Sequence, residues 1–142
     1  VHANPESLVR QVVASPHTII ASDGFMGHPR NSGCYSRILG KYVRENRDLS
    51  LMVALKKCAL WPAQRLEKCA PAFKKKGRLQ VGADADIIIF DAGKIIDKAT
   101  FKDAAQFSTG IQYTLVHGVP VVKNGKFQKN IFPGQAARGI IR

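Results

Sequence analysis

Asp23 stands at a position where a carboxylate could do chemistry. It follows the apolar run of residues 18–22 and precedes Gly24, a pattern that predicts a short buried strand over residues 17–22 with an aspartate at its end. In α/β folds the carboxyl ends of parallel strands carry catalytic groups, so Asp23 is a candidate base or metal ligand. The alternative is that Asp23-Gly24 is only a turn, because both residues are favoured in turns.

The cysteines do not have the spacing of a metal site. Cys34, Cys58 and Cys69 lie 24 and 11 residues apart and include no Cys-x-x-Cys pair. We therefore expect no structural zinc site made by this chain alone. An odd number of cysteines without a secretory signal at the N-terminus is typical of reduced thiols, which predicts a cytoplasmic protein.

The charge of the chain is strongly positive. It has a formal net charge of +12, from 22 Lys and Arg against 10 Asp and Glu. The basic residues are spread along the chain, and the densest run, over residues 74–78, is typical of a solvated loop. No aromatic RNA-binding motif or zinc-finger spacing accompanies it, so we do not expect a nucleic-acid partner. No apolar run approaches the roughly 20 residues of a membrane span, so we expect no membrane partner.

Helical and strand-like patterns position these residues. Asn4, Pro5 and Glu6 indicate the start of a helix over residues 5–14, which together with the strand over 17–22 makes one αβ step. A loop is expected over 24–33. Three further helices are expected. The first spans 34–47 and has an apolar stripe of Ile38, Leu39, Tyr42 and Val43. The second spans 51–59, capped by Ser50, and the third spans 63–67 after Pro62; together they are expected to bury Leu51, Val53, Leu55, Leu60 and Leu66.

The pattern changes near residue 76. Residues 68–77 read as a basic linker, and the periodicity then shortens to that of strands. Short strands are expected over 78–80, 86–91, 111–117 and 118–123, with a loop and a helical turn over 93–109. Asn124-Gly125 is a strong hairpin signal before a return strand at Lys126-Phe127.

A series of segments along nearly the whole chain matches the motifs of one known family. These segments are Ala21-Ser22-Asp23-Gly24, His28-Pro29-Arg30, Ser32-Gly33, Arg37 to Glu45, Leu49-Ser50-Leu51, Pro62 to Leu66, Gly77-Arg78-Leu79, Gly82 to Asp91, Ala99-Thr100-Phe101, Gly110-Ile111 and Val116 to Val122. They resemble the N-acyl-D-amino-acid deacylases (D-aminoacylases) of the metal-dependent amidohydrolase superfamily. The segment 82–86 is common to many amidohydrolases, whereas the loop over 28–30 and its helix point more narrowly to the D-aminoacylases.

The resemblance implies an α/β fold made of the C-terminal part of a (β/α)8 amidohydrolase barrel followed by part of a small β-sandwich domain. Residues 1–76 would hold the eighth barrel strand, over 17–22, and the helices after it, and residues 77–142 the part of the sandwich. The resemblance further implies that Asp23 is the general base beside a divalent metal, expected to be zinc, and makes it a candidate ligand of that metal. A carboxylate in that place can take a proton from the attacking water and pass it to the leaving amine.

The resemblance also indicates residues that bind the substrate. His28, Arg30, Ser32 and Gly33 follow the eighth strand, so they are candidate substrate-binding residues, with His28 and Arg30 near the substrate carboxylate. For His28 the alternative is a His-Pro pair that only shapes the loop. His17, at the start of the strand, and His117, in a hairpin bend, are expected to be structural.

The chain departs from the family pattern in its metal ligands. Its four histidines, His2, His17, His28 and His117, include no His-x-His pair, and one carboxylate does not build a zinc site. We therefore expect the C-terminal portion of an enzyme that is inactive as an isolated chain and binds no metal alone. Its partners would be the rest of the barrel, from the same or a second polypeptide, and an N-acyl amino acid in the complete enzyme. An uncovered Ile- and Val-rich sheet edge also predicts self-association. Two alternatives stay open: a cyclic-amide amidohydrolase of the dihydroorotase or hydantoinase kind, and a non-catalytic basic binding module that kept the fold.

Overall fold

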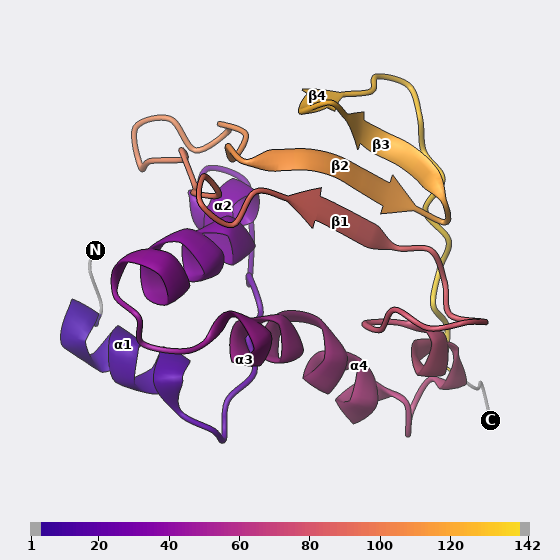
Figure 1. Ribbon diagram of the computed structural model, residues 1–142, viewed down its shortest axis with the longest axis horizontal. Coiled ribbons are helices and arrows are strands. Elements are labelled where there is room, and N and C mark those ends of the chain that lie inside the picture. Colours follow the sequence, from indigo (N-terminus) through magenta and orange to yellow (C-terminus); the bar gives the residue numbers. More distant parts are fainter. Residues whose placement is uncertain (1–3, 140–142) are drawn as a thin grey trace.

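Residues 4–139 are described by a computed structural model, in which helices precede a small sheet (Figure 1). His2 lies outside the described residues. The first helix, α1, spans Glu6–Ala14 and confirms the expected helix over 5–14 to within one residue. Pro5, not Asn4, is its N-cap residue and forms no side-chain cap bond. No helix among residues 4–139 is long and apolar enough to cross a bilayer.

The strand predicted over residues 17–22 is not formed. A strand is defined by its hydrogen bonds to a neighbouring strand, and this segment lies beside a helix instead: the Ile20 amide donates to the Lys57 carbonyl at 3.0 Å. The apolar run was identified correctly as chain that packs against the interior, since Ile20 contacts the core. The assignment as a strand was wrong because the described residues supply no partner strand next to it.

The second helical stretch begins earlier than predicted. Helix α2 spans Arg30–Arg37 and continues into the π-helix η1, Ile38–Glu45. Arg30, Ser32 and Gly33 therefore lie in the first turn of a helix and not in a loop. The helix start follows Pro29, whose fixed φ of −60° suits a helix N-terminus. Its end precedes Arg47, whose left-handed φ of 57° cannot continue a helix.

The third helical stretch runs on without the predicted break. Helix α3 (Leu51–Leu55), the π-helix η2 (Lys56–Leu60) and α4 (Trp61–Leu66) follow one another directly. Ser50 is the N-cap, as predicted, and its hydroxyl accepts from the Val53 amide at 3.4 Å. Pro62 lies within the first two positions of α4 and does not separate two helices, because the Lys57 carbonyl, which an N–H at this position would meet in the π pattern, accepts from the Ile20 amide instead.

The core lies among the helices. Its buried members are Val13, Ile38, Leu39, Tyr42, Ala54 and Ile95. The predicted stripe of the second helix is confirmed, since three of its four residues are buried and Val43 packs against them. Val53 and Leu66 were predicted to be buried and are exposed, because the buried face of the third stretch is centred on Ala54 and Lys57.

The segment between helices and sheet is more structured than a linker. Residues Pro71–Lys75 form the 3-10 helix η3. The strand predicted over 78–80 is absent; its Arg78 side chain instead pairs with Glu67. Lys76 pairs with Asp84 at 3.1 Å and with Asp86 at 2.5 Å. Ion pairs therefore connect this segment both to the end of the helices and to the start of the sheet. The boundary at residue 76 stays a prediction.

The sheet contains four antiparallel strands in the order β1-β2-β3-β4. They span Ile87–Phe90, Ile111–Val116, Val119–Lys123 and Lys126–Phe127, close to the predicted positions. Two tight turns join the last three strands, and the residues in them, His117-Gly118 and Asn124-Gly125, all have positive φ, as such hairpins require. The loop predicted over 93–109 is present, and it opens with a single turn in which the Ile95 amide donates to the Asp91 carbonyl at 2.9 Å. A bridge between Ile96 and Thr109 closes the loop.

Candidate functional site

Asp23 presents its carboxylate to solvent. The side chain is 86% exposed, and one of its oxygens lies 2.8 Å from an Nη atom of Arg30. Its backbone has a left-handed φ of 44°, a conformation that aspartate tolerates better than most residues. The structure thus brings together two of the predicted site residues, the carboxylate after residue 22 and the guanidinium at the start of α2.

His28 and Arg30 are held by an aromatic cluster that the sequence pattern did not indicate. The Arg30 amide donates to His28 Nδ1 at 3.2 Å. The His28 ring lies 5.4 Å from the ring of Phe25 and 5.1 Å from that of Phe101, and the Arg30 guanidinium lies 5.1 Å from the Phe25 ring. These contacts support the loop-shaping alternative for His28. Phe101 is far from this loop in sequence, so only the fold could place it here.

The guanidinium of Arg30 retains a donor for a further acceptor. Its Nε atom is buried and, among the described residues, has no hydrogen-bond partner, although a buried donor normally has one. With one Nη on Asp23 and Nε buried and unpaired, the hydrogen-bonding capacity of Arg30 is only partly filled.

Ser32 and Gly33 face the loop over residues 93–109. Ser32 Oγ donates to the Ala104 carbonyl at 2.9 Å, and the Ser32 carbonyl accepts from Ser108 Oγ at 3.3 Å. A Cβ at Gly33 would lie 2.6 Å from Cβ of Asp97, so only glycine fits there. Both residues hold α2 against this loop in the structure, and their part in substrate binding stays a prediction.

Burial favours the protonated form of two of the thiols. Cys34 donates to the Ala21 carbonyl at 3.7 Å, and burial raises the pKa of its thiol. Burial raises the pKa of Cys58 to about 12. A thiol binds metal as a thiolate, and within residues 4–139 no three His, Cys, Asp or Glu side chains gather closely enough to hold a metal ion.

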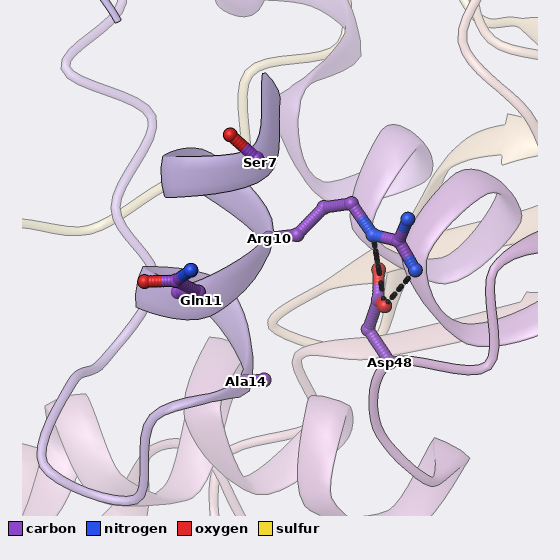
Figure 2. Close-up of a pocket in the computed structure, with 5 residues that line it drawn as sticks. All are labelled: Ser7, Arg10, Gln11, Ala14 and Asp48. Carbon is purple, nitrogen blue, oxygen red and sulfur yellow. Dashed lines mark hydrogen bonds and ion pairs between the residues drawn. The ribbon is translucent and has the colours of Figure 1, made fainter. Parts of the chain in front are cut away.

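Two open pockets lie away from Asp23. One, of about 320 Å³, is lined by Ser7, Arg10, Gln11, Ala14 and Asp48 (Figure 2). Arg10 reaches across it from α1 and pairs with Asp48 through two nitrogens, at 2.6 and 3.0 Å. This guanidinium lowers the pKa of Asp48 and so favours its ionised form. The other pocket, of about 500 Å³, is lined by His17, Ile19, Trp61, Gln64, Arg65 and Lys68.

The chain is similar to known deacylases along most of its length. The model of the amidohydrolase family matches residues 8–122. An N-acyl-D-glutamate deacylase of Alcaligenes xylosoxydans xylosoxydans is 37% identical over 123 residues, which are 84% of this chain and 24% of that protein. A D-aminoacylase of the same organism is 33% identical over 137 residues, which are 94% of this chain and 26% of that protein.

Solved structures show the same likeness. N-acyl-D-glutamate deacylase from Bordetella bronchiseptica, complexed with zinc and a phosphonate inhibitor, superimposes with a TM-score of 0.83 at 33% identity, over 95% of this chain and 28% of that one. A D-aminoacylase with a binuclear metal centre gives a TM-score of 0.80 at 29% identity, over 89% of this chain and 26% of that one. The chain thus spans about a quarter of the length of these relatives. The resemblance inferred from its motifs is confirmed, and the chain belongs to the amidohydrolase family.

Proposed function

We propose that this chain is the C-terminal portion of a metal-dependent amidohydrolase that hydrolyses the amide bond of N-acyl-D-amino acids. The observation that carries the proposal is the exposed Asp23 carboxylate beside Arg30, in a chain whose relatives are N-acyl-D-amino-acid deacylases. Solvent exposure leaves the carboxylate of Asp23 open to reactants from outside this chain.

In this proposal Asp23 is the general base. Its carboxylate takes a proton from the attacking water while the water oxygen bonds to the amide carbon, and it then gives that proton to the leaving nitrogen as the C–N bond breaks. A substrate of this class also carries the free carboxylate of its amino acid. Arg30 would bind that carboxylate, because its partly exposed guanidinium lies beside Asp23 and carries donors beyond the one Nη that Asp23 occupies.

The described residues do not make a metal site by themselves. Asp23 could supply at most one ligand, so the proposal assigns the other ligands to the part of the enzyme outside this chain. Divalent zinc bound there would polarise the scissile carbonyl and make the water more acidic. The isolated chain is accordingly expected to be inactive, and a chelator-sensitive deacylase activity from these 142 residues alone would contradict this part of the proposal.

The proposal extends to the architecture. Residues 1–76 would complete a (β/α)8 barrel, with the segment over 17–22 at the place of its last strand. Within residues 4–139 no strand lies beside this segment, and it would pair once the preceding barrel strand is present. Residues 77–142 would form part of a small β-sandwich, to which the four antiparallel strands contribute.

The test is an Asp23→Asn variant of the full-length enzyme. Loss of the base should lower kcat by about 10²- to 10⁴-fold, with KM and zinc content unchanged. The matched control is Asp103→Asn, which replaces a carboxylate that accepts a hydrogen bond from the Gln106 amide and should retain full kcat. Unchanged turnover by the Asp23 variant would remove the general-base assignment.

A further inference from the structure

Lys57 is a buried cation that forms no ion pair among the described residues. Its side chain is fully buried, at 0% exposure. Its Nζ donates to the Ser15 carbonyl at 2.5 Å, to the Thr18 carbonyl at 2.7 Å and to Thr18 Oγ1 at 2.9 Å. An ammonium has three donors, so all three are used. Burying a charge is costly unless it is fully hydrogen-bonded. An apolar side chain would fill the same space without this cost, so packing alone does not account for a lysine here.

The backbone of the same residue holds the same segment. In η2 the Trp61 amide donates to the Lys56 carbonyl, five residues back. The next residue, Pro62, has no N–H to offer the Lys57 carbonyl in this pattern. That carbonyl accepts from the Ile20 amide at 3.0 Å. Lys57 therefore contacts the segment over residues 15–20 through both its side chain and its main chain.

These bonds lie just before Asp23. The chain leaves α1, passes α3 and rises to α2 (Figure 1), and it reaches Asp23 three residues after Ile20. Farther along, the Cys34 thiol donates to the Ala21 carbonyl at 3.7 Å. No described strand lies beside this segment, so contacts with helices, and above all with Lys57, determine where Asp23 is presented.

We propose that Lys57 is a positioning residue, which fixes the chain that carries Asp23 relative to the helices and thereby sets the geometry of the general base. This inference rests on the proposed function of Asp23. A carboxylate displaced by about 1 Å can lose on the order of 10²-fold in rate. Loosening this anchor should therefore affect the chemical step and leave substrate binding largely intact.

The experiment compares Lys57→Met with Lys56→Met in the full-length zinc enzyme. Lys56 is the exposed neighbour of Lys57, so the pair controls for loss of one positive charge. With kcat normalised to zinc content, Lys57→Met should lower kcat by about 10- to 100-fold with KM within about twofold, and Lys56→Met should leave both unchanged. Lys57→Gln keeps an N–H donor, so its kcat should lie between those of Lys57→Met and the native enzyme. A merely structural role would reduce the amount of folded enzyme but not kcat per zinc.

A second variant covers the case in which Lys57→Met does not fold. Thr18→Val preserves the side-chain volume and removes one of the three acceptors, so it should lower kcat by less than Lys57→Met. If Thr18→Val keeps native kcat while Asp23→Asn is inactive, the positioning role is wrong and the proposed function stands. If Asp23→Asn keeps native kcat, both proposals are wrong.

Discussion

The helices and the sheet of this chain bury their apolar side chains to different degrees. Residues of α1, η1 and α3 form a core that includes Val13, Ile38 and Ala54. None of the four strands contributes a buried residue, and the adjacent Ile88 and Ile89 of β1 are 49% and 50% exposed. Adjacent strand residues point to opposite faces, so both faces of β1 are open to solvent at these two positions, while Phe90 at its end packs against the core. Packing therefore contributes more to the helices than to the sheet.

Ile95 joins the two regions. It follows β1 in the chain, is 2% exposed and belongs to the core among the helices, against which Phe90 of β1 and Ile111 of β2 also pack. Glycines approach its backbone from both sides: a Cβ at Gly40 would lie 2.5 Å from the Ile95 carbonyl oxygen, and one at Gly110 would lie 2.5 Å from its nitrogen. The sheet is therefore attached to the helices through close backbone contact.

The strongest test of the contrast removes one isoleucine from each region. Ile38→Ala should lower the free energy of unfolding by about 2–5 kcal/mol, because it leaves a cavity in a packed core. Ile89→Ala should cost below about 1 kcal/mol, since half of that side chain is already in water. Urea unfolding measures both values. Equal losses would show that β1 is as well covered as η1, contrary to the structure.

A smaller effect is expected at the junction. Gly40→Ala would bring a methyl group against the Ile95 carbonyl, and overpacking of this kind costs about 1–3 kcal/mol, against a gain of up to about 1 kcal/mol in helix propensity. Gly134→Ala is the control, because a Cβ there meets no atom within 4 Å. Thermal unfolding of the two variants decides the matter: the same Tm for both would mean that helix and loop are not in close contact.

The smallest effect concerns the charges that tie Lys76 to the sheet. The hydrogen bond from Lys76, together with the His117 amide that donates at 2.9 Å, holds the pKa of Asp86 below its usual range. A carboxyl whose pKa is lowered in the folded state stabilises the protein above its unfolded pKa, about 3.9, and this contribution is lost as the pH falls through the folded pKa. Asp86→Asn should therefore be less stable than the native chain at pH 7, by below about 1 kcal/mol for so accessible a pair.

The pH dependence is the readout for this pair. Urea midpoints of the native chain and of Asp86→Asn should differ at pH 7 and converge as the pH falls below about 4. Asp103→Asn serves as the comparison, since that carboxylate is bonded to a neutral amide. A gap between native and Asp86→Asn that persists unchanged in acid would exclude the ion pair as its cause.

Features set by neighbouring residues could be predicted from the sequence. The Asn124-Gly125 turn requires positive φ at two successive positions, and the Ser50 cap needs only an amide three residues on, so both were correct. The apolar stripe containing Ile38 and Tyr42 was also correct, because one helix face is enough to define it. The family was recognised from motifs of this local kind.

Features that depend on distant chain could not be predicted. An apolar run such as residues 17–22 becomes a strand only next to another strand, and here a lysine carbonyl lies beside it. Pro62 predicts a helix break, but the helix runs on through it because the Lys57 carbonyl bonds to the distant Ile20 amide. At the candidate site, Asp23 and Arg30 were identified separately, but their ion pair and the ring of Phe101 depend on the folded chain.

The left-handed backbone of Asp23 has a consequence for how this site could change over time. At a φ of 44° a glycine would be less strained than any residue with a Cβ. The side chain is almost fully exposed and contributes no packing, so Asp23→Gly is expected to leave stability unchanged or raise it. Selection for stability alone would therefore favour loss of this carboxylate. Its retention in an active lineage would reflect a stability–activity trade-off, and a descendant freed from catalysis should lose Asp23 early.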